Sequence, residues 1–130
     1  MCKACDIDPK AHSFFKIATE DTIQIFYSCP AEATQYFDKE SVELHCREKL
    51  QEKGYKNKWS FIFDGKGYTL RHALALGVST TFLSVIKDHA DTLVEIRILN
   101  TSTHVSTMLS VMKPFIPDNI YSKINWNTFK

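Results

Sequence analysis

The stretch 59–68, Trp-Ser-Phe-Ile-Phe-Asp-Gly-Lys-Gly-Tyr, constrains the fold more than any other part of the chain. Four of its first five side chains are apolar or aromatic, which predicts a strand buried on both sides. The run stops at Asp64, and Gly65 and Gly67 permit a tight turn directly after it. Ligand sites in open α/β sheets lie outside the carboxyl ends of the strands. The turn after Asp64 is therefore the first place where we expect function.

Strands and helices are predicted to alternate on both sides of this stretch. Aromatic and β-branched residues around Glu20-Asp21 predict a hairpin over 13–28. Periodicity and turn signals then predict helices over 39–53, 69–90 with a break near Gly77, 102–113 and 118–122, and strands over 93–99 and 123–126. Such alternation implies right-handed crossovers. We therefore predict one α/β domain over 12–130, preceded by a polar lead-in over 1–11, with a mostly parallel, mixed sheet of about five strands.

Composition excludes several classes of protein. A net charge of +1 over 130 residues argues against a nucleic-acid binder, which needs a strongly basic face. The N-terminus has no apolar signal region, and the chain has no apolar run long enough to cross a membrane. Four cysteines are too few for a disulfide scaffold. We predict a cytoplasmic protein with reduced thiols.

Motifs for catalysis, cofactors and metals are incomplete. The segment Gly65-Lys66-Gly67 resembles the start of a dinucleotide fingerprint, but Leu70 stands where the third glycine belongs, so no cofactor is predicted. The pair Cys2-x-x-Cys5 has no second pair, and His12 and His45 do not form one, so no metal site is predicted. His89 and Asp91 are the best acid–base pair but lack a nucleophile. We expect no enzyme, and the alternative is a small hydrolase that uses this pair.

Four segments, in this order, resemble those of the CRAL-TRIO lipid-binding family. They are the hairpin over 13–28, the strand and turn Phe61 to Gly67, the strand Ile96 to Asn100, and Met112-Lys113-Pro114-Phe115-Ile116 running on to Lys123-Ile124. The resemblance covers roughly residues 12–126. It implies a hydrophobic cavity between a sheet and a set of helices that holds a phospholipid or another small hydrophobic ligand, and a role in binding or transfer.

The resemblance also suggests candidate binding residues. Thr69 and Arg71 fall where phosphoinositide-binding members carry headgroup hydroxyls, and Asp91 falls where they carry a glutamate. Apolar stripes on the predicted helices over 69–90 and 102–113 would form the cavity wall. Such stripes alone do not distinguish a cavity from a packed core. The full candidate set is Tyr68, Thr69, Arg71, Phe82, Val85, Ile86, His89, Asp91, Val105, Met108 and Met112.

The chain also departs from the family. The family continues past the Lys-Ile strand into a gate helix and a further basic headgroup ligand, whereas this chain ends at Lys130. Without a gate we expect an apolar face open to water, which favours an alternative: a ligand-free interaction module that binds itself or a protein partner. Trp126 and Phe129 among the lysines of the 123–130 tail also suggest peripheral membrane contact.

Overall fold

The structure, a computed structural model, describes residues 3–54 and 56–125. Apart from a short helix within the lead-in, which was not predicted, the main elements follow the predicted order with small differences in their bounds. The strands are β1 (Phe15–Glu20), β2 (Ile23–Ser28), β3 (Trp59–Asp64), β4 (Leu93–Leu99) and β5 (Ile124–Asn125). The α-helices are α1 (Lys3–Ile7), α2 (Lys39–Glu52), α3 (Leu70–Leu74), α4 (Leu76–Asp88), α5 (Thr103–Met112) and α6 (Asp118–Tyr121). Short 3-10 turns span Pro30–Glu32, Ala90–Thr92 and Lys113–Phe115.

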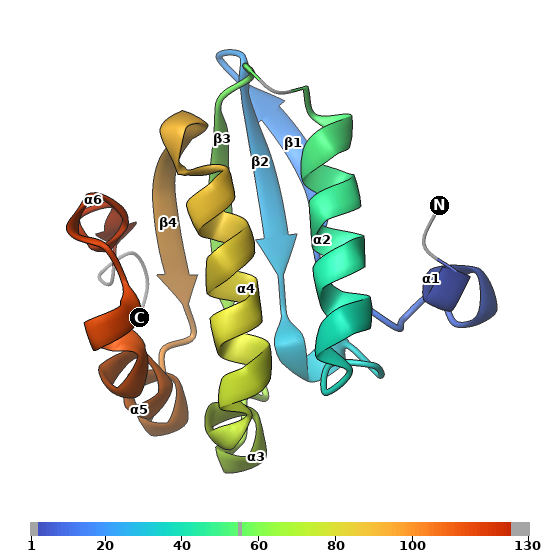
Figure 1. The fold of residues 1–130 in the computed structure, drawn as a ribbon, viewed down its shortest axis with the longest axis vertical. Coiled ribbons are helices and arrows are strands. Elements are labelled where there is room, and N and C mark those ends of the chain that lie inside the picture. The colour runs from blue at the N-terminus through green and yellow to red at the C-terminus, as the bar shows by residue number, and fades with distance from the viewer. Residues whose placement is uncertain (1–2, 55, 126–130) are drawn as a thin grey trace.

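The five strands form one mixed sheet in the order β1-β2-β3-β4-β5. The β1–β2 hairpin is antiparallel, and each later strand joins its neighbour in parallel. Helices α2 and α4 lie side by side across one face of the sheet (Figure 1). This confirms the predicted α/β fold with its mostly parallel sheet.

Local sequence explains where several elements begin and turn. Asp21 and Thr22 have positive φ values, which lets the hairpin reverse in two residues. The side chain of Asp38 accepts a hydrogen bond from the Ser41 amide at the start of α2, and Ser102 caps α5 in the same way. The break predicted near Gly77 in the helical region 69–90 occurs at Ala75, between α3 and α4.

The expectation that β3 is buried on both sides is wrong. Trp59, Phe61 and Phe63 are buried, but Ser60 and Ile62, which alternate with them, are only half-buried. A strand whose residues are all apolar can still lie in a sheet with helices packed on one face, because the sequence does not say what covers each face. On β4, a register shift against β3 leaves Val94 exposed, so it does not share a face with Ile96 and Ile98.

Helix lengths also bear on membrane contact. Among the described residues, no helix is both long and apolar enough to cross a bilayer.

Candidate functional site

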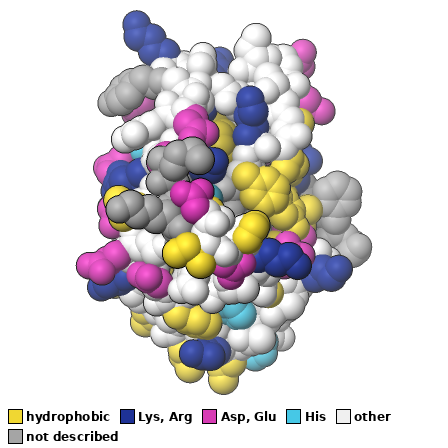
Figure 2. Space-filling model, turned by 90° about the vertical axis from the view of Figure 1, so that its right-hand side faces the viewer, with side chains coloured by type: hydrophobic (Ala, Val, Ile, Leu, Met, Phe, Trp, Pro, Cys, Tyr) yellow, Lys and Arg dark blue, Asp and Glu magenta, His cyan; other side chains and the backbone are white. Residues whose placement is uncertain are grey.

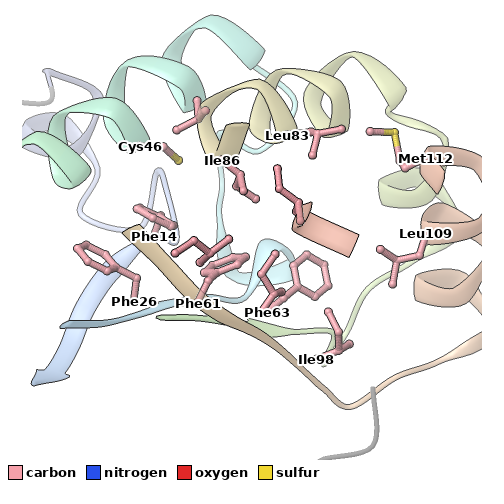
Figure 3. Close-up of a cluster of buried hydrophobic side chains, with 14 of the residues drawn as sticks. Phe14, Phe26, Cys46, Phe61, Phe63, Leu83, Ile86, Ile98, Leu109 and Met112 are labelled. Carbon is pink, nitrogen blue, oxygen red and sulfur yellow. The ribbon is translucent and has the colours of Figure 1, made fainter. Parts of the chain in front are cut away.

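An apolar cavity of about 120 Å³ lies between the sheet and the helices. Its floor comes from β3 and β4 through Phe61, Phe63, Ile96 and Ile98. In Figure 3, Phe14, Phe26, Phe61 and Phe63 lie on the sheet side, while Leu83 and Ile86 extend from α4. The α5 side chains Met108, Leu109 and Met112 close one side of the cavity. The cavity is thus bounded by segments that are far apart in the sequence.

A small group of hydroxyls lies beside this apolar space. Tyr36 and Ser79 line the cavity, and Tyr68 is buried close to them. Burial raises the pKa of Tyr68, and the neighbouring Tyr36 raises it further. The Tyr68 hydroxyl interacts with the Tyr36 and Ser79 hydroxyls, but none of these contacts has ordinary hydrogen-bond geometry among the described residues. Buried polar groups are stabilised by well-formed hydrogen bonds, so a polar atom of a ligand could complete the bonding of these three hydroxyls.

Four of the predicted binding residues line the cavity: Phe82, Ile86, Met108 and Met112. Val85 and Val105 are fully buried in the packed core and do not line it. Tyr68, one of the three clustered hydroxyl residues, stacks on His72 and packs against Phe63.

The four polar candidates lie elsewhere. Thr69 caps α3 in a reciprocal pair with His72, and the Arg71 guanidinium lies 4.3 Å from the centre of the Phe37 ring. The His89 Nδ1 lies 2.8 Å from the carbonyl oxygen of Val85, and Asp91 is exposed. Within the described residues no hydrogen bond joins His89 to Asp91, so the geometry gives the acid–base pair no support.

The turn after β3 ties three strands together. The Asp64 carboxylate accepts hydrogen bonds from the Tyr27 hydroxyl at 2.6 Å, the Asn100 amide at 2.7 Å and the Lys66 backbone amide at 2.9 Å. Burial raises the pKa of Asp64, but these hydrogen bonds outweigh it and hold the pKa below its ordinary value. The carboxylate is therefore occupied in joining the carboxyl ends of β2, β3 and β4.

Gly65 is required by the close approach of α5 and the end of β4. A Cβ atom there would lie 2.7 Å from the Val105 side chain and 2.8 Å from the Asn100 carbonyl oxygen. The turn after Asp64 was the first place where we expected function. It holds the carboxyl ends of the strands together and does not line the cavity.

The end of the molecule that carries α3 presents apolar side chains to solvent. Leu70 and Leu74 are 51% and 66% exposed, with Arg71 between them. In Figure 2, hydrophobic side chains reach the surface at the lower end of the molecule, beside basic and histidine side chains. The predicted membrane-contacting residues Trp126 and Phe129 lie outside the described residues.

A second cluster, separate from the hydroxyls, brings Cys5 of α1 together with His12 and with His45 of α2. Burial lowers the pKa of both histidines, which favours neutral rings. The sequence predicts no metal site from Cys2-x-x-Cys5, His12 and His45, because spacing along the chain does not show that residues of three different segments meet.

A sequence model of the CRAL/TRIO domain matches residues 37–129. The chain belongs to this family. Comparison with curated protein sequences gave no match. Among solved structures, the fold is similar to one described as the crystal structure of Sfh5, with a TM-score of 0.64 and 15% sequence identity. That match covers 90% of this chain but only 48% of the Sfh5 chain, so this chain spans about half its length.

Membership of the CRAL/TRIO family supports, in general terms, the binding of a lipid or another small hydrophobic molecule. The apolar cavity between sheet and helices lies where that expectation placed it.

Proposed function

We propose that this domain binds one small amphiphile, with the apolar part in the cavity and a polar group against the hydroxyls of Tyr36, Tyr68 and Ser79. The domain performs no chemistry on it. The observation that carries the proposal is an almost entirely apolar cavity that meets these hydroxyls on one side. Binding pockets for small molecules have this character, with few polar groups in an apolar lining.

The size of the cavity limits how the ligand is held. Drug-sized ligands occupy pockets of roughly 300–1,000 Å³, whereas this cavity measures about 120 Å³. An acyl chain therefore needs α4 or α5 to move away from the sheet. The long, unbranched side chains of Met108 and Met112 on α5 suit such repacking.

The test is native mass spectrometry of the purified protein, followed by analysis of an organic extract. We expect a mass excess of one ligand per chain. Ser79→Ala should lower the occupied fraction, because it removes a hydroxyl from the cavity wall, whereas Ser84→Ala on the exposed side of α4 should not. A bare mass in repeated preparations, with no binding of added fatty acid, contradicts the proposal.

The proposal includes exchange of the ligand with a membrane. We propose that α3 is the element that contacts the membrane. Leu70 and Leu74 with the intervening Arg71 suit the boundary between headgroups and acyl chains. Replacing both leucines by serine should reduce flotation with vesicles of phosphatidylcholine and phosphatidylserine. Leu44→Ser, at a 73% exposed position on α2, is the matched control. Equal flotation of all three proteins contradicts this assignment.

A phosphoinositide headgroup is a narrower form of the same proposal. Arg71 is exposed and could contact a phosphate, although its guanidinium stacks on Phe37 and the Thr69 hydroxyl is engaged with His72. Arg71→Gln should weaken binding to vesicles that contain phosphoinositide more than binding to vesicles that contain an equal charge of phosphatidylserine. An equal loss on both indicates general electrostatic attraction.

The second candidate function is a ligand-free interaction module that binds itself or a protein partner. The small size of the cavity and an exposed edge of the sheet favour it. Strand β1 lies at the edge, and its apolar residues Phe15 and Ile17 are 43% and 50% exposed. Exposed apolar edge strands are templates for pairing with another chain. This candidate predicts a dimer in sedimentation that Ile17→Lys disrupts, and a monomer across the accessible concentration range contradicts it.

A further inference from the structure

Three side chains from separate segments converge beside α2, and one of them, His12, also lines the apolar cavity. The Cys5 Sγ lies 3.5 Å from the Nδ1 of His12 and 3.5 Å from the Nδ1 of His45. All three atoms lie within 4.8 Å of one another. Both histidines are buried, and the centres of their rings are 4.6 Å apart. One thiol and two imidazole nitrogens thus face a common point.

The two sulfur–nitrogen distances match those of a tetrahedral zinc site. Zinc–sulfur and zinc–nitrogen bonds of about 2.3 and 2.05 Å, separated by a tetrahedral angle, place sulfur and nitrogen about 3.6 Å apart. The two observed sulfur–nitrogen distances are both 3.5 Å. A tetrahedral zinc holds its two nitrogen ligands about 3.3 Å apart, whereas the histidine nitrogens here are bounded only by the 4.8 Å spread of the cluster. Zinc binding therefore needs the two rings to move toward each other, while the sulfur already lies at a suitable distance from both.

The outer nitrogen of each ring has a partner that orients it. The His45 Nε2 lies 2.8 Å from the Phe14 carbonyl oxygen, which can only accept, so in the neutral ring Nε2 carries the proton. The lone pair of His45 is then on Nδ1 and directed at Cys5. The His12 Nε2 lies 2.7 Å from the Ser41 hydroxyl, which can orient that ring in the same way. Zinc-binding histidines characteristically have such partners on the nitrogen that does not bind the metal.

The cluster can also be described without a metal. The Cys5 thiol would donate to His45 while His12 donates to the sulfur, with Ser41 donating to His12. Sulfur is a weak donor and a weak acceptor, so this arrangement fixes two buried rings through weak bonds. A metal ion would instead bind the sulfur and both inward-facing nitrogens at once. Metal uptake by the protein distinguishes the two descriptions.

We propose that Cys5, His12 and His45 bind one Zn²⁺ ion that fastens α1 to α2. Binding forms one zinc–sulfur and two zinc–nitrogen bonds, and the thiol proton passes to the buffer. Zinc fits this donor set because it is borderline soft and accepts both imidazole and thiolate. The sequence places Cys2 three positions before Cys5, but Cys2 lies outside the described residues and the proposal does not depend on it.

The test uses the full chain after treatment with a chelator and buffer exchange. Zn²⁺ is added and counted by native mass spectrometry, and Co²⁺ is added in a parallel titration followed by absorption. We expect one ion per chain and a thiolate-to-cobalt charge-transfer band. Copper is not used as a probe, because Cu²⁺ binds most nitrogen and sulfur sites more tightly than zinc does.

Variants separate the proposed ligands from other groups. Cys5→Ser and His45→Gln should each lower zinc affinity by at least tenfold and abolish or shift the cobalt band. Ser41→Ala should weaken binding less than either ligand variant and leave the cobalt band in place, since it removes only the partner that orients His12. Cys29→Ser and His104→Gln provide a cysteine and a histidine outside the cluster, and both should bind zinc normally.

Alkylation of the unaltered protein guards against variants that fail to fold. Zn²⁺ should slow the reaction of Cys5 with iodoacetamide, measured on its peptide, and leave the rate at Cys29 unchanged. No stoichiometric uptake of Zn²⁺, unchanged affinity in Cys5→Ser and His45→Gln, or no protection of Cys5 overturns the proposal.

Discussion

The two faces of β3 show how differently one strand can be used. On the face toward the helices, Trp59 and Phe61 are 0% and 2% exposed, and Phe61 lines the cavity. On the opposite face, Ser60 and Ile62 are half-buried, and Asp64 ends the strand in a hydrogen-bonded network with Tyr27 and Asn100. The first face holds the apolar core and its cavity, and the second holds the polar network that joins the strand ends.

This difference shows that hydrophobicity along a strand does not measure burial. Ile62 is as apolar as its neighbours, but the helices that cover Phe61 and Phe63 lie on the other side of the sheet (Figure 1). Stability and ligand binding should therefore respond strongly to changes on the helix-covered face, and the opposite face should respond mainly at Asp64.

The largest expected effect is on the helix-covered face. Phe61→Ala should lower the free energy of unfolding by about 3–5 kcal/mol, because a buried aromatic side chain is removed from the core. Ile62→Ala, one position along on the other face, should cost only about 1 kcal/mol. Urea unfolding of both variants measures the difference. Equal losses would mean that Ile62 is covered in solution, and the contrast between the faces would fail.

Asp64 is the exception on the opposite face. Asp64→Asn should lower the free energy of unfolding at neutral pH by about 1.5–3 kcal/mol, because hydrogen bonds to a charged acceptor are replaced by weaker ones.

The pH dependence gives Asp64 a second test. Its pKa is lower in the folded than in the unfolded state, so its contribution is complete above the unfolded pKa and is lost as pH falls through the folded pKa. Stability of the wild type should decline across this acidic range more steeply than that of Asp64→Asn. Parallel curves would show that Asp64 does not titrate in this way.

A smaller effect, of the opposite sign, tests whether the cavity is hollow. Leu109→Phe adds volume at the cavity wall and should raise the free energy of unfolding of the ligand-free protein by about 1 kcal/mol. Leu93→Phe adds the same volume at a buried position outside the lining and should lower it by about 1–3 kcal/mol. Thermal unfolding measures both variants.

Ligand occupancy gives a second measurement on the same two variants. If the cavity holds the ligand, Leu109→Phe should also reduce the mass excess in native spectra, whereas Leu93→Phe should not. Destabilisation of similar size by both variants would indicate a packed core with no usable space.

Removing the Tyr27 hydroxyl should also have a small effect. Tyr27→Phe deletes one donor to Asp64 and leaves Asn100 and the Lys66 amide in place. We expect a loss of about 1 kcal/mol in urea unfolding and no change in ligand occupancy. A reduced occupancy would connect the polar network to the cavity and weaken the separation of the two faces.

Much of the fold could be predicted because its signals are local. The acidic turn after Glu20, the periodicity of α2 and the Gly-rich turn after β3 lie within short segments. Apolar spacing on α4 and α5 also indicated Phe82, Ile86, Met108 and Met112, which the structure places on the cavity wall. The same spacing included Val85 and Val105, which are packed in the core, because a helical stripe does not show which of its residues face a cavity.

The sequence by itself determined the order of strands and helices and the resemblance to the family, since turn residues and apolar periodicity act over a few positions. The tertiary structure alone decided that one face of β3 is covered, that Asp64 is held by Tyr27 and Asn100, and that Cys5 meets His12 and His45. Each of these depends on residues distant in sequence, and the distances between such residues are set by how the helices pack on the sheet.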